Sequence, residues 1–281
     1  MAEESLADML ALARRLGIEA IEITRPHVGR ITPSHKPDQS VVTEADHAVQ
    51  REIVAAVSER YPEHAFLTEE TLESPGAYPD RASARYCWVI DPIDGTRNFV
   101  AGFACFATSI AVLDRGVPVV AAIVEHNLGH VYAATVGGGA TLNDRRLQMV
   151  EPDPSQDMMV GVPSSKDALT RAVVAMWQGT PRLIPRNLGA SAVHLGMVAS
   201  GALGAMFCKK CRIWDIAAGV LLVTEAGGRV TLPSGAPRVP LPVTTDAATD
   251  TPVLAAAPEA HKRLLTGLRA LTETARSQPS R

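Results

Sequence analysis

The sequence has 281 residues, of which 46% are hydrophobic and 4% aromatic, and its formal net charge is −3. This length predicts one large domain or two fused layers that share a core, and the apolar fraction is ample for burial. The weak negative charge excludes the basic surface typical of proteins that bind nucleic acids or anionic membranes. Because no apolar run is long enough to span a bilayer and the N-terminus lacks a signal-peptide pattern, we expect a cytoplasmic protein.

The first half of the chain is predicted to mix helices and strands. In chain order we expect a helix over 5–24, a loop over 25–42, a helix over 43–61, a strand over 66–70, a polar loop over 71–85, and strands over 88–90, 109–113 and 117–124. The last two strands flank Asp114-Arg115-Gly116, which is a hairpin pattern, and Gly137-Gly138-Gly139 ends the strand that follows.

Strands and helices alternate more regularly in the second half of the chain. We expect strands over 158–162, 203–208, 229–232 and 253–256, helices over 166–178, 190–201, 215–226 and 258–272, and a loop over 236–252. This alternation predicts a sheet flanked by helices. The proline-rich segment 151–154 is the predicted boundary between an N-terminal α+β half, 1–150, and a C-terminal α/β half, 151–272, with a disordered tail over 273–281.

Four acidic residues stand at the ends of predicted elements: Glu69, Asp91, Asp94 and Asp215. Such positions allow a packed scaffold to aim side chains into one cleft. Two like charges about 4 Å apart cost roughly 4 kcal/mol at an effective dielectric near 20, so converging carboxylates favour bound cations. Oxygen ligands favour Mg²⁺ or Mn²⁺ over Zn²⁺, and carboxylates shared between ions predict a two-metal site.

Each acidic residue also has an ordinary structural interpretation. Asp91 could end a strand before a proline, Asp94 could belong to a turn, and Asp215 could cap a helix. Glu69 could be a solvated surface group. Asp46 forms a capping-box pattern with Thr43, but it lies on the buried face of its helix and needs a partner there. We favour the metal site because the acids occur together.

The Gly95-Thr96 pair directly follows Asp94, at the predicted start of a helix. Backbone N–H groups at a helix start attract phosphate, and glycine permits close approach, although a plain helix start fits the same pattern. A metal site beside a phosphate site is the minimal equipment for hydrolysing a phosphate ester.

The four cysteines do not form a disulfide framework in a chain of this length. Cys87 and Cys105 lie in apolar surroundings and are interpreted as buried thiols. Cys208 and Cys211 form a CxxC pattern without a second pair nearby, so a structural zinc site lacks ligands and a redox role is only weakly indicated.

Four separated motifs resemble those of the inositol monophosphatase family of lithium-sensitive, magnesium-dependent phosphatases. The segment 91–99, DPIDGTRNF, resembles its first signature and 214–219, WDIAAG, its second. Segments 68–70 and 42–46 are similar to two further family motifs, in the family's order. The resemblance implies an αβαβα layered sandwich of the type shared with fructose-1,6-bisphosphatase, usually a homodimer.

The resemblance also implies roles for individual residues. The implied metal ligands are Glu69, Asp91, the Ile93 carbonyl, Asp94 and Asp215, for two or three Mg²⁺ per subunit, with Mn²⁺ as an alternative. Thr96 and Asp46, helped by Glu69, would orient the attacking water. The implied phosphate and substrate contacts are Asp94, Gly95, Thr96, Gly189, Ala190, Ser191, Cys208 and Lys209.

Two departures from the family pattern concern the substrate. Cys208 stands where inositol-type members carry a glutamate, and Lys209, Lys210 and Arg212 follow it. The segment 36–40 resembles histidinol-phosphatase-like and nucleotide-phosphatase-like members instead.

We expect a Mg²⁺-dependent phosphomonoester hydrolase that acts on a small polyol, sugar or inositol phosphate, without nucleic-acid or membrane partners. Histidinol phosphate, fructose 1,6-bisphosphate and 3′-phosphoadenosine 5′-phosphate remain open as substrates. A non-catalytic phosphate-binding regulator is the alternative from another class.

Overall fold

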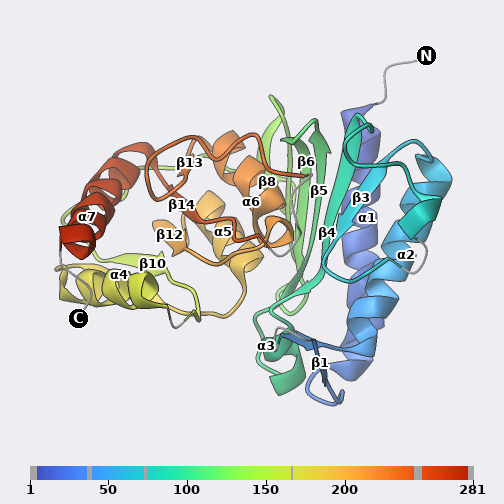
Figure 1. Cartoon of the computed structure of the whole chain (residues 1–281), viewed down its shortest axis with the longest axis horizontal. Coiled ribbons are helices and arrows are strands. Elements are labelled where there is room, and N and C mark those ends of the chain that lie inside the picture. Colours follow the sequence, from blue (N-terminus) through green and yellow to red (C-terminus); the bar gives the residue numbers. More distant parts are fainter. Residues whose placement is uncertain (1–4, 37–39, 73–74, 166, 244–248, 278–281) are drawn as a thin grey trace.

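Helices and sheets alternate in five layers in the computed structural model, which describes residues 5–36, 40–72, 75–165, 167–243 and 249–277 (Figure 1). One outer layer holds α1 (Leu6–Thr24) and α2 (Glu44–Arg60), and the other holds α4 (Ala168–Gly179) and α7 (Pro258–Ser277). Between two sheets lie α5 (Ser191–Ser200) and α6 (Ile213–Glu225). The predicted αβαβα sandwich is confirmed.

The first sheet has seven strands, which neighbour one another in chain order. They are β3 (Ala65–Thr68), β4 (Tyr86–Asp94), β5 (Ala107–Asp114), β6 (Val117–Glu125), β7 (His130–Thr135), β8 (Gly139–Leu142) and β9 (Arg145–Arg146). Only the pairing of β3 with β4 is parallel among these described strands. The predicted hairpin is therefore confirmed as β5 and β6.

The second sheet has five strands in the order β11-β10-β12-β14-β13. Their bounds are β10 (Met158–Gly161), β11 (Leu183–Arg186), β12 (Ala205–Cys208), β13 (Arg229–Thr231) and β14 (Val253–Ala256). The strand β10 pairs in parallel with both β11 and β12, and β14 runs antiparallel to both β12 and β13. The edge strand β11 was absent from the predicted elements.

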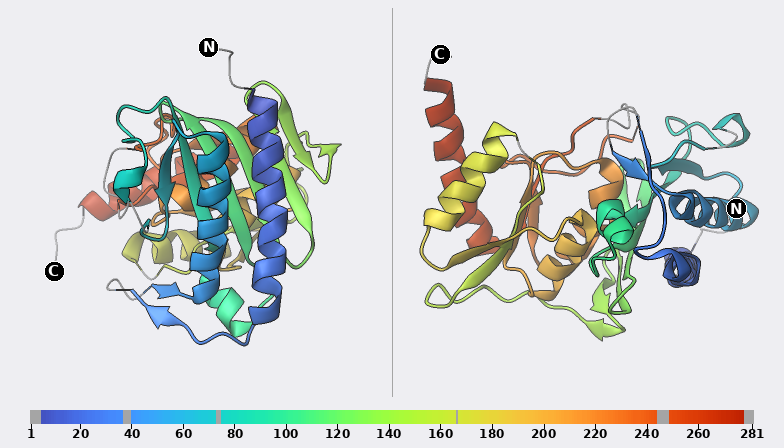
Figure 2. Two further views of the ribbon diagram at one scale, coloured as in Figure 1. Left: turned by 90° about the vertical axis from the view of Figure 1, so that its right-hand side faces the viewer. Right: turned by 90° about the horizontal axis from the view of Figure 1, so that it is seen from below.

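Alternating side chains along the strands form the core between the layers. In β4, Trp88 and Ile90 pack against α1 and α2, which lie side by side across that face of the sheet (Figure 2). Cys87 and Val89 face the opposite way, into the layer of α5 and α6. Because side chains alternate along a strand, Asp91 also projects toward α5 and α6.

Several boundaries differ from the predictions. The loop 25–42 contains a short 3-10 helix (Arg25–His27) and the two-stranded pair β1 (Ser34–His35) and β2 (Val41–Val42). A second 3-10 turn (Pro75–Ala77) lies in the polar loop. The helix α7 continues to Ser277, so the disorder predicted from residue 273 is wrong as far as 277.

Residues 278–281 of that predicted tail, and residues 37–39 of the segment 36–40, lie outside the described residues. None of the helices in the described part of the chain is both long enough and apolar enough to cross a membrane.

Candidate metal centre

A β-bulge near the end of β4 brings Asp91 and Asp94 to the same side of the sheet. Asp91 pairs with Ser109 and Asp94 with Ala107, so β4 advances by one more residue than β5 between the two pairs. In a regular strand, residues three apart point to opposite faces, and the extra residue reverses this. The Thr108 hydroxyl lies 2.8 Å from the Pro92 carbonyl oxygen and supports the bulge.

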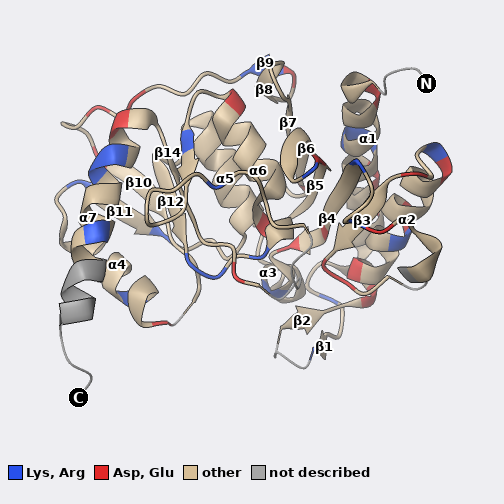
Figure 3. Ribbon diagram, turned by 45° about the horizontal axis from the view of Figure 1, so that its top comes forward, with Lys and Arg blue, Asp and Glu red and all other residues tan. Residues whose placement is uncertain are grey.

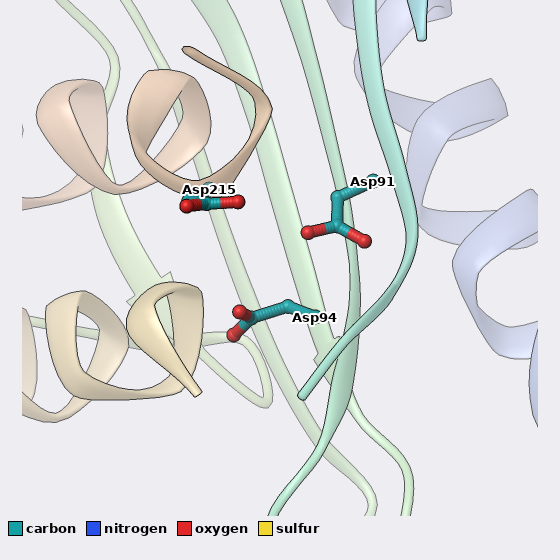
Figure 4. A group of neighbouring side chains, drawn as sticks. All are labelled: Asp91, Asp94 and Asp215. Atoms are coloured by element: carbon teal, nitrogen blue, oxygen red, sulfur yellow. The ribbon is translucent and has the colours of Figure 1, made fainter. Parts of the chain in front are cut away.

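Asp215 completes a cluster of three aspartates from the opposite half of the chain. One carboxylate oxygen from each of the three residues lies within 4.8 Å of those of the other two, and the three side chains surround a common space (Figure 4). Asp215 belongs to the first turn of α6 and accepts the Arg212 N–H at 2.8 Å. Figure 3 shows acidic segments gathering beside α3, between β4 and the start of α6.

The Asp91 carboxylate is the most deeply buried of the three. It is 1% exposed, and its Oδ1 has no hydrogen-bond partner among the described residues. Burial raises the pKa of Asp91 well above its usual value, and the charges of Glu69, Asp94 and Asp215 raise it further. Since a buried, unpaired carboxylate oxygen is costly, the site favours a cation that would bind it.

Asp94 also holds the N-terminal end of α5. Its two oxygens accept the backbone N–H groups of Ser191 at 3.0 Å, Ala192 at 2.8 Å and Val193 at 3.4 Å. Burial raises the pKa of Asp94 to about 7, although these donors act in the opposite direction. The Ser191 N–H, expected to be available to substrate, is therefore used by Asp94, a contact that sequence reasoning missed.

Glu69 lies at the end of β3 and its carboxylate is held by an ammonium group. Lys36 Nζ is 2.9 Å from Glu69 Oε1 and also pairs with Glu70. Burial alone would lower the pKa of Lys36, but the two glutamates together raise it. Gln50 fixes the segment by exchanging two hydrogen bonds of 3.1 Å with the Glu70 backbone. The Glu69 charge also acts on all three aspartates.

Thr96 and Asp46 meet at the first turn of α3 (Thr96–Ala101). The Thr96 hydroxyl is 3.0 Å from the Ile93 carbonyl oxygen and 3.5 Å from Asp46 Oδ1. The other Asp46 oxygen accepts the Thr43 N–H at 2.8 Å and the Thr43 hydroxyl at 2.6 Å, so the predicted capping box is present. Burial raises the pKa of Asp46 to about 7, despite the Thr43 hydrogen bonds.

The turn between β4 and α3 requires glycine. Gly95 has a φ of +88°, and an added Cβ would lie 3.0 Å from the Cys105 carbonyl oxygen and 3.1 Å from the Ala190 Cβ. Asn98 then fastens the turn, because its side-chain amide donates to the carbonyls of Cys105 at 2.6 Å and Leu188 at 2.7 Å. Sequence reasoning assigned Asn98 no role, since its partners lie in other segments.

A cleft of about 730 Å³ opens beside the aspartates. Its lining includes Glu69, Asp94, Gly95, Thr96, Arg97, Ser164, Gly189, Ala190, Ser191, Cys208, Lys210, Arg212, Asp215 and Asp250. The predicted site residues of both halves therefore border one space, with Asp91 buried behind it. The Lys209 ammonium instead lies 3.4 Å from Asp167, and Lys209 is not part of this lining.

The clustered carboxylates are better explained as ligands of a hard divalent cation than as residues that stabilise the fold. The donor set is made of carboxylate oxygens, which Mg²⁺, Mn²⁺ and Ca²⁺ prefer. A cation would pair the free oxygen of Asp91 and offset the repulsion that raises the pKa values of Asp91 and Asp215. Beside the acids, Gly95 and Thr96 line the same cleft, and backbone N–H groups at such a turn can receive an anion.

Comparisons with known proteins relate the chain to one family. The sequence profile of the inositol monophosphatase family matches residues 5–273. Over 238 residues the chain is 34% identical to Nus factor SuhB of Pseudomonas aeruginosa, an alignment that covers 79% of this chain and 84% of the relative. It is also 32% identical to the chloroplastic phosphatase IMPL1 of Arabidopsis thaliana over 82% of this chain, but it spans only 63% of that relative's length.

Among solved structures, an IMPase of Thermotoga maritima superimposes with a TM-score of 0.82 at 26% identity, over 95% of this chain and 99% of the other. The matched region includes both halves that contribute aspartates to the cluster. The chain therefore belongs to the inositol monophosphatase family, whose members are phosphomonoester hydrolases.

Proposed function

We propose that this protein is a Mg²⁺-dependent phosphatase that removes phosphate from a small polyol, sugar or inositol phosphate. The observation that carries the proposal is the cluster of Asp91, Asp94 and Asp215 beside an open cleft, with one buried oxygen of Asp91 unpaired. A structural role alone would leave that oxygen unexplained. Membership of the family supports the same reaction.

The acidic residues would hold the metal, with Glu69, the Ile93 carbonyl and the three aspartates as ligands. When bound there, Mg²⁺ supplies positive charge that lowers the pKa of water and offsets the charge of the phosphate oxygens. The phosphate would rest against the N–H groups of Gly95 and Thr96, where the start of α3 favours an anion. The ester would then lie between the acidic residues and the cationic side chains that line the cleft.

The Thr96 hydroxyl would orient the attacking water. It donates toward Ile93 or Asp46, so its oxygen lone pairs remain free to accept a hydrogen bond from water. Glu69 borders the same cleft and would accept the proton that the water loses. No side chain needs to form a covalent phosphoryl intermediate, because the attack proceeds in line from water.

Phosphate release from an aryl phosphate, with and without Mg²⁺, tests the proposal. Asp215→Asn should reduce kcat by at least about 100-fold, whereas the exposed Asp157→Asn, which removes an equal charge far from the cluster, should match wild type. A non-catalytic regulator is the outcome if Mg²⁺ binds but no phosphate is released from any ester. Equal activity with chelator present would overturn the metal assignment.

A bisphosphate is the second candidate substrate, because three cationic side chains, Arg97, Lys210 and Arg212, line the cleft. Lys210 is exposed there, and the Arg212 guanidinium pairs with Asp250 at 3.0 Å. These groups can receive a second anionic group of the substrate.

Lys210→Gln tests this candidate, with Lys209→Gln as its matched control, because the Lys209 ammonium pairs with Asp167 outside the cleft. A bisphosphatase should lose about 10-fold in kcat/KM for fructose 1,6-bisphosphate through Lys210→Gln and little for a simple monoester. Equal effects of both variants on both substrates would exclude this role.

A further inference from the structure

The CxxC pair lies where the wall of the cleft meets the metal centre. Cys208 is the last residue of β12 and lines the cleft, although it is only 2% exposed. Cys211 is fully buried, two residues before α6. All four cysteines in the described chain are free thiols, and Cys208 is among the groups that raise the pKa of the Cys211 thiol. The phosphatase mechanism uses neither sulfur in a chemical step.

Contacts around Cys211 link it, through neighbouring residues, to Asp94 and Asp215. Its Sγ lies 3.7 Å from the Ser191 hydroxyl, and the Ser191 N–H is held by Asp94 at 3.0 Å. The next residue, Arg212, donates its N–H to Asp215 at 2.8 Å. A change in the position of this sulfur therefore acts on the groups that orient two candidate metal ligands.

The backbone of Cys211 cannot move freely. Its carbonyl oxygen accepts the N–H and the hydroxyl of Thr251, both at 2.7 Å. Any rearrangement that joins the two sulfurs must therefore fall on the Cys211 side chain and on residues 208–210, which include the cleft-lining Lys210.

We propose that Cys208 and Cys211 are a dithiol modification site, which a peroxide oxidises to a disulfide that weakens cation binding. Cys208 reacts first because it borders the cleft. Its sulfur attacks one peroxide oxygen, the O–O bond breaks, and a sulfenic acid and water form. The Cys211 sulfur then attacks the sulfenic sulfur, the S–S bond forms, and the hydroxyl leaves as a second water with the Cys211 proton.

The consequence of the disulfide follows from these contacts. The Cys211 sulfur leaves Ser191, and residues 208–210 shift close to the Arg212 N–H that holds Asp215. Loss of such supporting contacts costs about 10- to 100-fold in metal affinity.

Peroxide treatment of the full chain, followed by thiol titration and peptide mapping, tests the modification. Wild type and the core variant Cys87→Ala should each lose the same two thiols, joined as a 208–211 disulfide, and regain them with dithiothreitol. Cys208→Ser and Cys211→Ser should form no intramolecular disulfide. Phenylarsine oxide, which bridges two nearby thiols, should bind wild type one to one and neither single variant.

Calorimetry with Mg²⁺ then tests the consequence without using activity, although the effect on turnover rests on the proposed function. Oxidised wild type should bind Mg²⁺ about 10- to 100-fold more weakly, and reductant should restore the affinity. Four unreacted thiols in wild type, or a disulfide that leaves Mg²⁺ affinity unchanged, would overturn the proposal. An enzyme inactive toward every ester, but with this redox-dependent affinity, would refute only the proposed function.

Discussion

Replacing Asp91 with asparagine should stabilise the metal-free protein while removing its response to Mg²⁺. The change keeps the shape of the side chain but removes one of three acidic groups that each place an oxygen within 4.8 Å of the other two. A structural aspartate would behave in the opposite way, because its loss would weaken the fold. The variant therefore separates a site built for a cation from a site built for packing.

The size of the effect follows from the distances. Two carboxylate charges 4.8 Å apart repel by about 3 kcal/mol at an effective dielectric of about 20, and Asp91 has two such neighbours. Protonation relieves part of this repulsion, as the raised pKa values of Asp91 and Asp215 indicate. We therefore expect the free energy of unfolding to rise by about 2 to 4 kcal/mol at about pH 8 without metal.

Urea unfolding in chelator and in millimolar Mg²⁺ measures both effects. Wild type should gain stability from Mg²⁺ in proportion to the logarithm of its concentration, whereas Asp91→Asn should gain little. Asp157→Asn, on the surface, serves as the matched control and should respond like wild type. The reasoning is refuted if Asp91→Asn destabilises the metal-free protein, or if Mg²⁺ stabilises both proteins equally.

Three further outcomes are expected. Because burial raises the folded-state pKa of both Asp46 and Asp94 to about 7, the metal-free folded protein binds more protons than the unfolded chain. The free energy of unfolding should fall as pH rises from about 4 to 7, by up to about 1.4 kcal/mol per group and pH unit. Urea titrations at a series of pH values should show that this dependence on pH is weaker with Mg²⁺. Asn98→Ala should lower the free energy of unfolding by about 2 kcal/mol, whereas the exposed Asn187→Ala should change it little; equal losses would contradict the role of Asn98. Thr96→Val should reduce kcat by about 100-fold with unchanged circular dichroism, and a loss confined to KM would argue against its role in orienting water.

Most strands and helices could be predicted because each has a local apolar pattern, whereas the five-layer arrangement is implied only by the resemblance to the family. The alternation of Trp88 and Ile90 with Cys87 and Val89, for example, reflects a strand buried on both faces. The edge strand β11 lacks such a pattern, because it is only partly buried and contains Pro185. Its position depends on β10 and could not be inferred from its own residues.

The acidic cluster could be anticipated from motifs, but its geometry could not. The bulge between Asp91 and Asp94 depends on the register of β5, which a one-residue slip would change. The contact of Asp94 with α5 joins residues almost a hundred positions apart. The orientation of the adjacent Lys209 and Lys210 depends on Asp167, so the sequence could not show which of them borders the cleft.

Asp94 accepts hydrogen bonds from the first turn of α5, so cation affinity depends on how well the α5–α6 layer packs against the seven-stranded sheet. A core truncation such as Leu195→Ala, in α5 but beyond the N–H groups that Asp94 accepts, should loosen α5 and weaken Mg²⁺ binding before it unfolds the chain. The affinity for Mg²⁺ is thus a measure of how tightly α5 and α6 pack against the seven-stranded sheet. Selection for tight ion binding would therefore also preserve the core packing between the layers of this fold.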